Sequence, residues 1–206
     1  MSSVANLARN PDATRGRILE VAFDEILRKG FQGLRVDEVL KIAGLTKGAF
    51  YHHFASKQAL GYAIIDEVLF ERMREQWQVP LADADNPIDA IIDICKMARE
   101  DLTIEQMATG CPLNNLTQEM SPLDEGFRER IAGVWDLWIQ AMADALRKGQ
   151  QAGQVRTDID ADNVSRFVVS SIEGIIGQVK CFKCQELFEN VGNCLRQYLE
   201  DLRAQP

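Results

Sequence analysis

Residues 44–57 read GLTKGAFYHHFASK, and this stretch decides how the rest of the chain is interpreted. It contains two lysines, two adjacent histidines and three aromatic residues, but no carboxylate. The gap in acidic residues is wider still, because no Asp or Glu occurs between Glu38 and Asp66. The only two histidines of the protein, His52 and His53, lie in the same region. A segment with cations and no anions predicts contact with a polyanion.

The charge of the whole chain is divided unevenly. The protein has 206 residues and a formal net charge of −8. Residues 1–60 contain nine Lys or Arg and six Asp or Glu, a net of +3, whereas residues 61–206 contain fourteen and twenty-five, a net of −11. Screening limits electrostatic reach to about 8–10 Å, so a partner responds to the local face rather than to the total. The acidic total therefore does not exclude a nucleic-acid partner.

Composition also limits the compartment and the chemistry. No apolar run of about 18 residues occurs and the first residues lack the apolar core of a secretory signal, so we expect a cytoplasmic protein without membrane contact. Five cysteines, an odd number, indicate reduced thiols. Cys181 and Cys184 form a CxxC, but a structural zinc ion requires four ligands, so we expect no metal site. We also expect no cofactor. No phosphate loop, HExxH or GxSxG motif indicates an enzyme.

Apolar residues recur at helical spacing along nearly the whole chain, which predicts an all-α fold of about nine helices. The predicted helices span residues 13–29, 36–43, 47–53, 57–78, about 20 residues from Pro87, helices beginning at Pro112 and Pro122, 160–181 and 184–203. Gly30 and Gly44 are expected to end the first two helices, and residues 79–87 are expected to form a loop. Asn86, Cys111 and Ser121 each precede a proline, as a helix N-cap does.

The arrangement of short helix, glycine-containing turn and short helix is a helix-turn-helix. Within it, GLTKGAFYHHFASKQAL (residues 44–60) resembles the recognition segment of TetR-family transcriptional regulators. The shared pattern is a Gly, a Ser/Thr, a Lys/Gly pair, an aromatic, Tyr-x-His/Tyr-Phe and then a Lys. The resemblance is close over residues 13–60 and holds beyond them only in helix count and order. It implies a helix-turn-helix DNA-binding domain at residues 1–57 and an effector-binding and dimerisation domain at residues 58–206.

The resemblance also implies roles for individual residues of this segment. The positions that face bases or the groove wall are Thr46, Lys47, Gly48 and His52. The positions where phosphate contacts are made are Tyr51, His53 and Lys57, although His53 can equally be a solvated side chain. The residues themselves agree with this assignment, because Thr46 is placed to cap the third helix and Gly48 permits close approach of the backbone. Phe50 and Phe54 are expected to fasten the helix to its neighbours.

One position departs from the family pattern. Family members usually have Ser or Thr before the second helix, whereas this chain has Leu34 and Arg35. Arg35 cannot accept a hydrogen bond from the helix amides, so a weaker cap is expected. Its guanidinium either contacts a phosphate directly or is solvated.

The second domain contains no histidine and offers candidates for effector binding. The candidate lining residues are Trp135, Trp138, Met142, Met97, Met107 and Met120, for each of which plain core packing is the alternative. Cys111, as an N-cap, is expected to have a lowered thiol pKa. The segment GCPLNNLTQEMS around it resembles the NemR-like branch of the family, some members of which are regarded as sensors of electrophiles or oxidants through a cysteine here. Cys111 is therefore either a sensor or a thiol of a ligand pocket, and Lys180 would stabilise its thiolate if the two lie close.

These observations lead to a main hypothesis and an alternative. The main hypothesis is a homodimeric TetR-type regulator, a repressor released from a palindromic operator in double-stranded DNA by a small-molecule, electrophile or oxidant effector. The apolar rows of the last two predicted helices, 160–181 and 184–203, would form the dimer interface. The alternative is a helical small-molecule-binding protein or enzyme with an incidental helix-turn-helix. An activator role also remains open.

Overall fold

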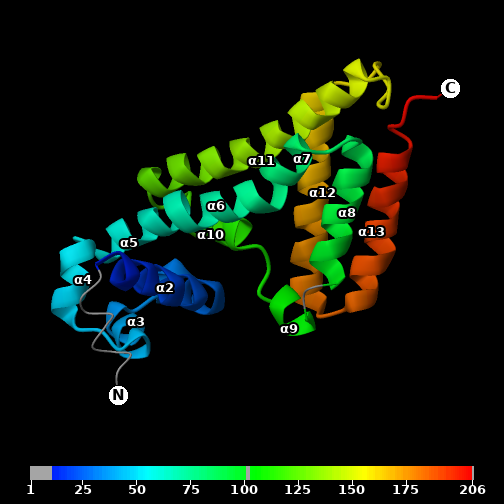
Figure 1. Ribbon diagram of the computed structural model, residues 1–206. Coiled ribbons are helices and arrows are strands. Elements are labelled where there is room, and N and C mark those ends of the chain that lie inside the picture. The colour runs from blue at the N-terminus through cyan, green and yellow to red at the C-terminus, as the bar shows by residue number, and fades with distance from the viewer. Residues whose placement is uncertain (1–10, 101–102, 206) are drawn as a thin grey trace. The chain divides into compact units, whose positions relative to one another are not determined.

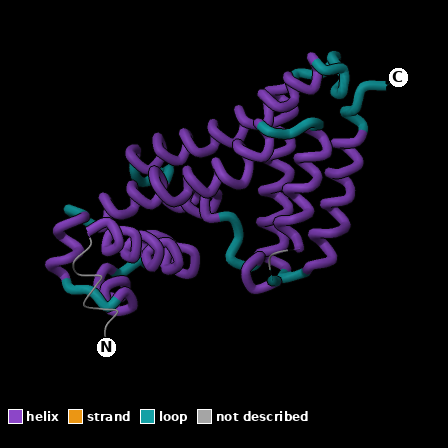
Figure 2. The backbone as a smooth tube through the Cα atoms, viewed as in Figure 1, coloured by secondary structure: helices purple, strands orange, loops and turns teal. Residues whose placement is uncertain are grey.

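The structure is a computed structural model that describes residues 11–100 and 103–205. Helices and loops account for these residues, and the one extended pairing among them is an isolated bridge between Val155 and Arg203 (Figure 2). The predicted all-α class is therefore confirmed. Among the described helices, none has the length and apolar character that a bilayer span requires.

The order of the elements is shown in Figure 1. They are α2 (Pro11–Gly33), α3 (Val36–Ala43), α4 (Lys47–His53), α5 (Lys57–Ala63), the π-helical η1 (Ile64–Leu69), α6 (Phe70–Met73), the π-helical η2 (Arg74–Gln78), α7 (Val79–Ala82), α8 (Pro87–Glu100), α9 (Ile104–Met107), α10 (Pro112–Met120), α11 (Glu125–Gln151), α12 (Ala161–Phe182) and α13 (Gln185–Glu200). The bounds of α3 and α4 are those predicted from the sequence.

Local signals explain why the first helices end where they do. Gly30 has a left-handed φ of 74° and breaks the helical backbone of α2, as predicted. Gly44 has a φ of 70° and ends α3, and its N–H donates to the carbonyl of Leu40. Both positions favour glycine because a Cβ strains the left-handed conformation.

Two predicted boundaries are wrong. The sequence predicts a loop at residues 79–87, but α7 continues the helical path to Ala82. Pro80 has no N–H to donate to this continuous helix, and the π-helical η2, whose hydrogen bonds already depart from the α pattern, lies immediately before α7. The long α11 begins at Glu125 rather than at Pro122, because the carboxylate that caps it by accepting from the N–H of Phe127 at 3.0 Å belongs to Asp124.

The chain divides into two compact units. The first comprises residues up to Phe70 together with Asn115–Ala132, and the second comprises Glu71–Asn114 and the residues from Gly133 onward. Each of the three points where the chain passes between the units lies inside a helix, namely α6, α10 and α11. The functional boundary at residue 57 stays a prediction.

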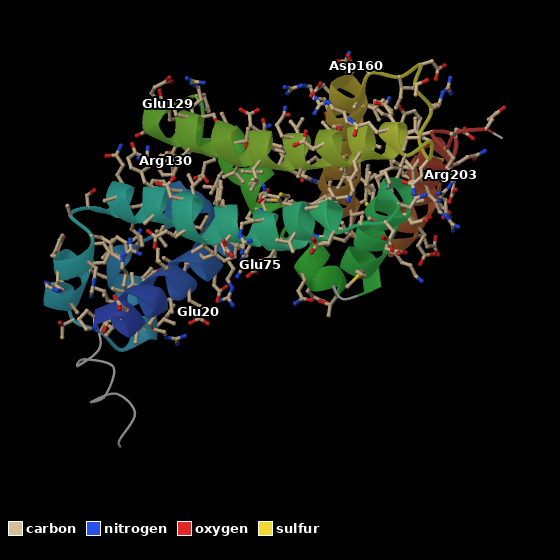
Figure 3. The ribbon with its side chains drawn as sticks, turned by 45° about the horizontal axis from the view of Figure 1, so that its top comes forward. Glu20, Glu75, Glu129, Arg130, Asp160 and Arg203 are labelled. Carbon is tan, nitrogen blue, oxygen red and sulfur yellow. The ribbon has the colours of Figure 1, made fainter. Side chains whose placement is uncertain are left out.

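The first unit is built around aromatic packing against a glycine. The rings of Phe31, at the end of α2, and Phe127, on α11, lie 4.6 Å apart between centroids. A Cβ added to Gly61 of α5 would lie 2.5 Å from atoms of both rings. On the outer side, Arg130 stacks over the Tyr62 ring at 4.2 Å, and its Nε donates to Asp66 (Figure 3).

In the second unit α8, α12 and α13 lie side by side (Figure 1). Asp160 caps α12 by accepting from the N–H of Asn163 at 2.9 Å. Near the end of the chain, Arg203 donates to Glu200 and to Asp89 of α8, both at 2.6 Å (Figure 3). These contacts fix α13 against α8.

Replacing Gly61 tests the close packing of the first unit. We expect Gly61→Ala to lower the free energy of unfolding by about 1–3 kcal/mol, because the new methyl group overlaps two buried rings. Gly133→Ala, at a helical position where a Cβ meets nothing within 4 Å, is the matched control and should be neutral or stabilising. Urea unfolding followed by circular dichroism measures both, and equal stability of the two variants would contradict the packing described here.

Candidate nucleic-acid interface and effector region

The helix α4 is short, and its ends and one face are fixed by specific contacts. Thr46 is the N-cap, and its Oγ1 accepts from the N–H of Ala49 at 3.3 Å, as predicted. At the other end, the N–H of Phe54 donates to the carbonyl of Phe50 at 2.8 Å. Phe50 and Phe54 are 0% and 3% exposed, so both are core residues, which confirms the prediction.

Burial of these two rings leaves the opposite face of α4 in solvent. The exposed predicted site residues are Thr46, Lys47, Gly48, Tyr51 and His52. Tyr51 is 62% exposed although its ring packs edge-on against Phe50. A Cβ on Gly48 would meet nothing closer than the Thr46 hydroxyl at 3.8 Å, so the fold itself does not require glycine there. The absence of a side chain at this exposed position is then best explained by a binding partner that approaches the helix backbone closely.

The absence of carboxylates from this segment does not extend to its neighbours in space. Asp37, in the first turn of α3, accepts an ion-pair contact from the Lys47 ammonium at 3.0 Å. Its hydrogen bond raises the pKa of Lys47. Both side chains are largely exposed, so the pair is weak and a stronger anion can compete for the lysine. Sequence analysis missed Asp37 because it lies just outside the acid-free stretch.

The remaining predicted DNA-contacting residues are less accessible or have other partners. The Lys57 ammonium donates to the Gln32 carbonyl at 3.0 Å and lies 4.8 Å above the Phe31 ring, and burial lowers its pKa. His53 is partly buried, which lowers its pKa, and the neighbouring His52 adds to this effect. Arg35 is exposed at the N-cap of α3 and makes no side-chain cap, so the predicted weaker cap is confirmed. The DNA roles of these residues stay predictions.

A carboxylate from a distant part of the chain supports the helix-turn-helix. Glu119, on α10, accepts from the backbone N–H groups of Phe31 and Gln32 at 2.9 and 2.7 Å. These donors directly follow the break in the helical backbone at Gly30. No local signal in the sequence indicates this contact, because 87 and 88 positions separate the partners.

In the second unit, Cys111 faces a buried acid that sequence analysis missed. Glu173, on α12, is 7% exposed, and neither of its oxygens has a hydrogen bond of good geometry among the described residues. Burial raises its pKa, although the Cys111 thiol and the Asn114 side chain lie close enough to lower it in part. Burial raises the pKa of the Cys111 thiol, and the Glu173 carboxylate raises it further, against the opposing backbone N–H of Asn114. The predicted lowering of this pKa is therefore wrong, because burial and a nearby anion outweigh the helix N-terminus. The sequence signal that could have indicated this buried acid is the single Glu within the apolar row of α12.

Comparison with known proteins identifies the family to which this chain belongs. Residues 18–64 match the family model described as bacterial regulatory proteins, tetR family, and residues 87–194 match the model described as Tetracyclin repressor-like, C-terminal domain. The second match covers more than half of the chain. The protein belongs to the TetR family of transcriptional regulators.

Individual relatives agree with this assignment. The regulator is 30% identical to the transcriptional regulator AcuR of Cereibacter sphaeroides, over 82% of this chain and 78% of AcuR. It is 27% identical to the HTH-type transcriptional repressor DhaR of a Mycobacterium species, over 87% and 88% of the two chains. A TetR regulator from Chloroflexus aurantiacus has a similar structure, with a TM-score of 0.83, 26% identity and coverage of 96% and 100%. Reduced Escherichia coli NemR shares the fold, with a TM-score of 0.78 at 24% identity and coverage of 94% and 98%.

The tryptophan and methionine candidates of this TetR-family regulator occupy different environments. Trp138 and Met142 are buried, and Trp135 is partly buried. The rings of Trp138 and Trp135 are stacked, with their centroids 5.9 Å apart. The rings of Trp138 and Trp77 are tilted, with their centroids 4.8 Å apart, and Trp77 was not among the predicted residues. The other methionines differ as well: Met120 is buried, Met97 is 60% exposed, and the Met107 side chain lies outside the described side chains. Lys180 is exposed, and its proximity to Cys111 stays a prediction.

The carboxylate beside Cys111 is expected to control the reactivity of the thiol. In Glu173→Gln the anion is lost, so the Cys111 pKa should fall and its alkylation by iodoacetamide at pH 8 should accelerate by about 3–10-fold. Peptide mass spectrometry measures the rate, with the exposed Cys194 as internal control. Slower alkylation in the variant would instead show that the carboxylate assists removal of the thiol proton.

The same variant has a pH signature in stability. Burial raises the pKa of Glu173, so the folded wild type loses stability as pH rises from the unfolded pKa of about 4.3 through the folded value. Glu173→Gln lacks this loss, and its stability advantage over wild type should grow with rising pH. Urea unfolding at pH 5 and pH 8 measures the difference.

Proposed function

We propose that this TetR-family regulator is a homodimeric repressor that binds a palindromic operator in double-stranded DNA and releases it when a small molecule binds. The observation that supports this most strongly is the α4 helix, which is anchored by two buried phenylalanines and exposes Lys47, Gly48 and Tyr51 to solvent. The alternative of a helical enzyme or binding protein with an incidental helix-turn-helix is not favoured, since both family models are those of regulators. The relative DhaR is described as a repressor.

The exposed face of α4 fits the major groove. Lys47 can exchange its weak contact with Asp37 for a phosphate or a base edge. Gly48 lets the backbone approach, and Tyr51 presents a hydroxyl to a phosphate. His52 is available to a base edge or the groove wall. These groups share one surface because the burial of Phe50 and Phe54 fixes the orientation of α4.

The two last helices are proposed to form the dimer interface. Phe167 and Phe182 of α12 are 53% and 66% exposed, which is unusual for side chains of this size. Phe167 contacts Tyr198 of α13 with ring centroids 4.9 Å apart, so the exposed aromatic surface extends across both helices. A two-fold dimer through this surface would present two α4 helices to half-sites about 34–36 Å apart.

The second unit contains the candidate effector site. The Trp138 Nε1 and both Glu173 oxygens are buried without hydrogen bonds of good geometry among the described residues, and such groups gain most from a ligand that supplies them. Cys111, Lys180, Trp135 and Met142 remain the further candidates for effector contact. An electrophile or oxidant that acts on Cys111 would meet a protonated thiol at neutral pH, because its pKa is raised.

The DNA-binding proposal is tested with a palindrome selected from a random DNA pool. We expect Tyr51→Phe to weaken binding by about 3–30-fold per dimer, because both protomers lose a hydroxyl contact while the exposed ring keeps its packing. Lys47→Gln should also weaken binding and reduce the salt slope by about 2 per dimer. Asp37→Asn should strengthen binding, because it frees Lys47 and removes an anion. Fluorescence anisotropy at several salt concentrations measures all three.

The matched control is Lys148→Gln, an exposed lysine of α11 in the second unit that undergoes the same charge change. Its affinity and salt slope should equal those of wild type. If Tyr51→Phe and Lys47→Gln behave like this control, α4 does not contact DNA and the proposal fails. Increased expression of a reporter behind the operator on deletion of the gene separates a repressor from an activator.

A further inference from the structure

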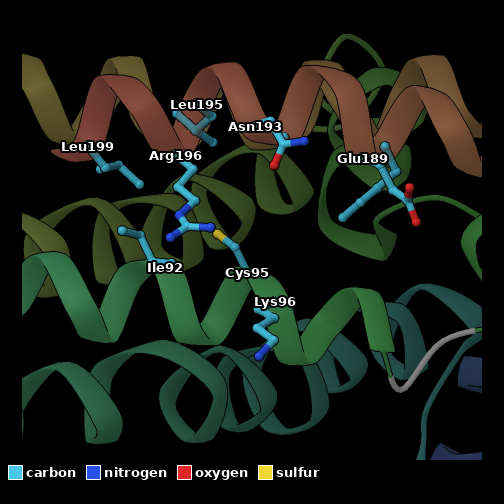
Figure 4. A pocket seen from close by; sticks show the side chains of 10 residues that line it. Ile92, Cys95, Lys96, Glu189, Asn193, Leu195, Arg196 and Leu199 are labelled. Atoms are coloured by element: carbon cyan, nitrogen blue, oxygen red, sulfur yellow. The ribbon is translucent and has the colours of Figure 1, made fainter. Parts of the chain in front are cut away.

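A pocket lies between α8 and α13, and its lining residues include neither the tryptophans of the aromatic cluster nor Glu173 (Figure 4). Its volume is about 180 Å³. Ligand pockets for drug-sized molecules span about 300–1,000 Å³, and one liquid water occupies about 30 Å³. The pocket therefore suits a molecule of fewer than about ten non-hydrogen atoms.

A glycine on α13 leaves this space open. Gly192 lines the pocket in the middle of a helix, where glycine costs about 1 kcal/mol relative to alanine. A Cβ added there would meet nothing within 4 Å, so neither a neighbouring side chain nor the backbone conformation requires glycine. What the missing side chain provides is volume in the pocket.

Apolar side chains form part of the pocket wall. Leu195 and Leu199 of α13 are buried, and Ile92 of α8 faces the same space. Cys95, one turn from Ile92, adds a thiol whose pKa burial raises to about 12. The thiol is therefore protonated at neutral pH and acts as a small apolar group without repelling an anion.

The charged residues of the lining are two cations and one carboxylate. Arg196 and Glu189 project from α13, whereas Lys96 projects from α8 and its side chain points away from α13 (Figure 4). The Arg196 guanidinium reaches only 4.0 Å from Glu200, whose closer partner is Arg203 at 2.6 Å. Its donors are thus weakly engaged, and a planar guanidinium is suited to hold a carboxylate through two parallel hydrogen bonds.

We propose that this α8–α13 pocket binds a short-chain amphipathic carboxylate, whose hydrocarbon chain lies in the space beside Gly192 and whose carboxylate contacts Arg196. The apolar side chains of the wall select the hydrocarbon chain, and Arg196 selects the charge. None of the lining residues belongs to the proposed effector region. Binding at this pocket can be measured on the regulator without DNA.

Hexanoate is the probe, because its eight non-hydrogen atoms fit the volume. By isothermal titration calorimetry we expect one site per chain with a Kd of about 0.1–1 mM. Gly192→Leu fills the space and should weaken binding at least tenfold, and Arg196→Gln should weaken it about tenfold. Gly133→Leu, at another helical position without neighbours within 4 Å, is the matched control and should bind as wild type does.

Two further measurements locate the ligand. Saturating hexanoate should slow the alkylation of Cys95, which lines the pocket, and leave the exposed Cys194 of α13 unchanged. Hexanamide, which lacks the charge, should bind at least fivefold more weakly than hexanoate. Circular dichroism establishes that each variant is folded. The proposal is overturned if wild type shows no saturable binding below 10 mM, if Gly192→Leu and Arg196→Gln bind as tightly as wild type, or if Cys95 is not protected.

Discussion

The burial of Phe50 and Phe54 is the constraint on which the DNA-contacting surface depends. A helix of seven residues is not stable alone in water, because the cost of nucleation exceeds the gain from so few hydrogen bonds. Complete burial of each ring contributes about 1.5–3 kcal/mol, which is enough to order α4. The same burial determines the opposite face, so the positions of Lys47, Tyr51 and His52 follow from the packing of two residues that themselves face the core.

Local chemistry explains which parts of the fold could be predicted from sequence. The bounds of α3 and α4 were predicted correctly because glycine at residue 44 and the hydroxyl of Thr46 act within one helical turn. The start of α11 was not, because Ser121 and Asp124 are both good caps and only the path of the chain selects between them. Pro80 favours a loop when the sequence is taken alone, and the π-helical segment that precedes it in the continuous helix has no local sequence signal.

The candidate sites were predicted in part, and the failures have a common physical cause. Residue types and their spacing indicated the cations of α4 and of the start of α5 but not their partners, such as Asp37 for Lys47 and Gln32 for Lys57. The pKa of Cys111 was predicted in the wrong direction because its two main causes, burial and the Glu173 carboxylate, arise from tertiary packing. A helix N-terminus is visible in a sequence, whereas the side chain that α12 places beside it is not.

The way the chain passes between the two compact units has a consequence for proteolysis. The chain passes between them at three points, and each lies within a helix rather than in a loop. Proteases cut exposed loop tips first, because helical backbone must unfold locally before it fits their active sites. None of the three crossings offers such a loop, so limited digestion is not expected to cut there and release either unit intact. The units of this regulator therefore differ from domains joined by a flexible polar linker, whose boundary a protease finds easily.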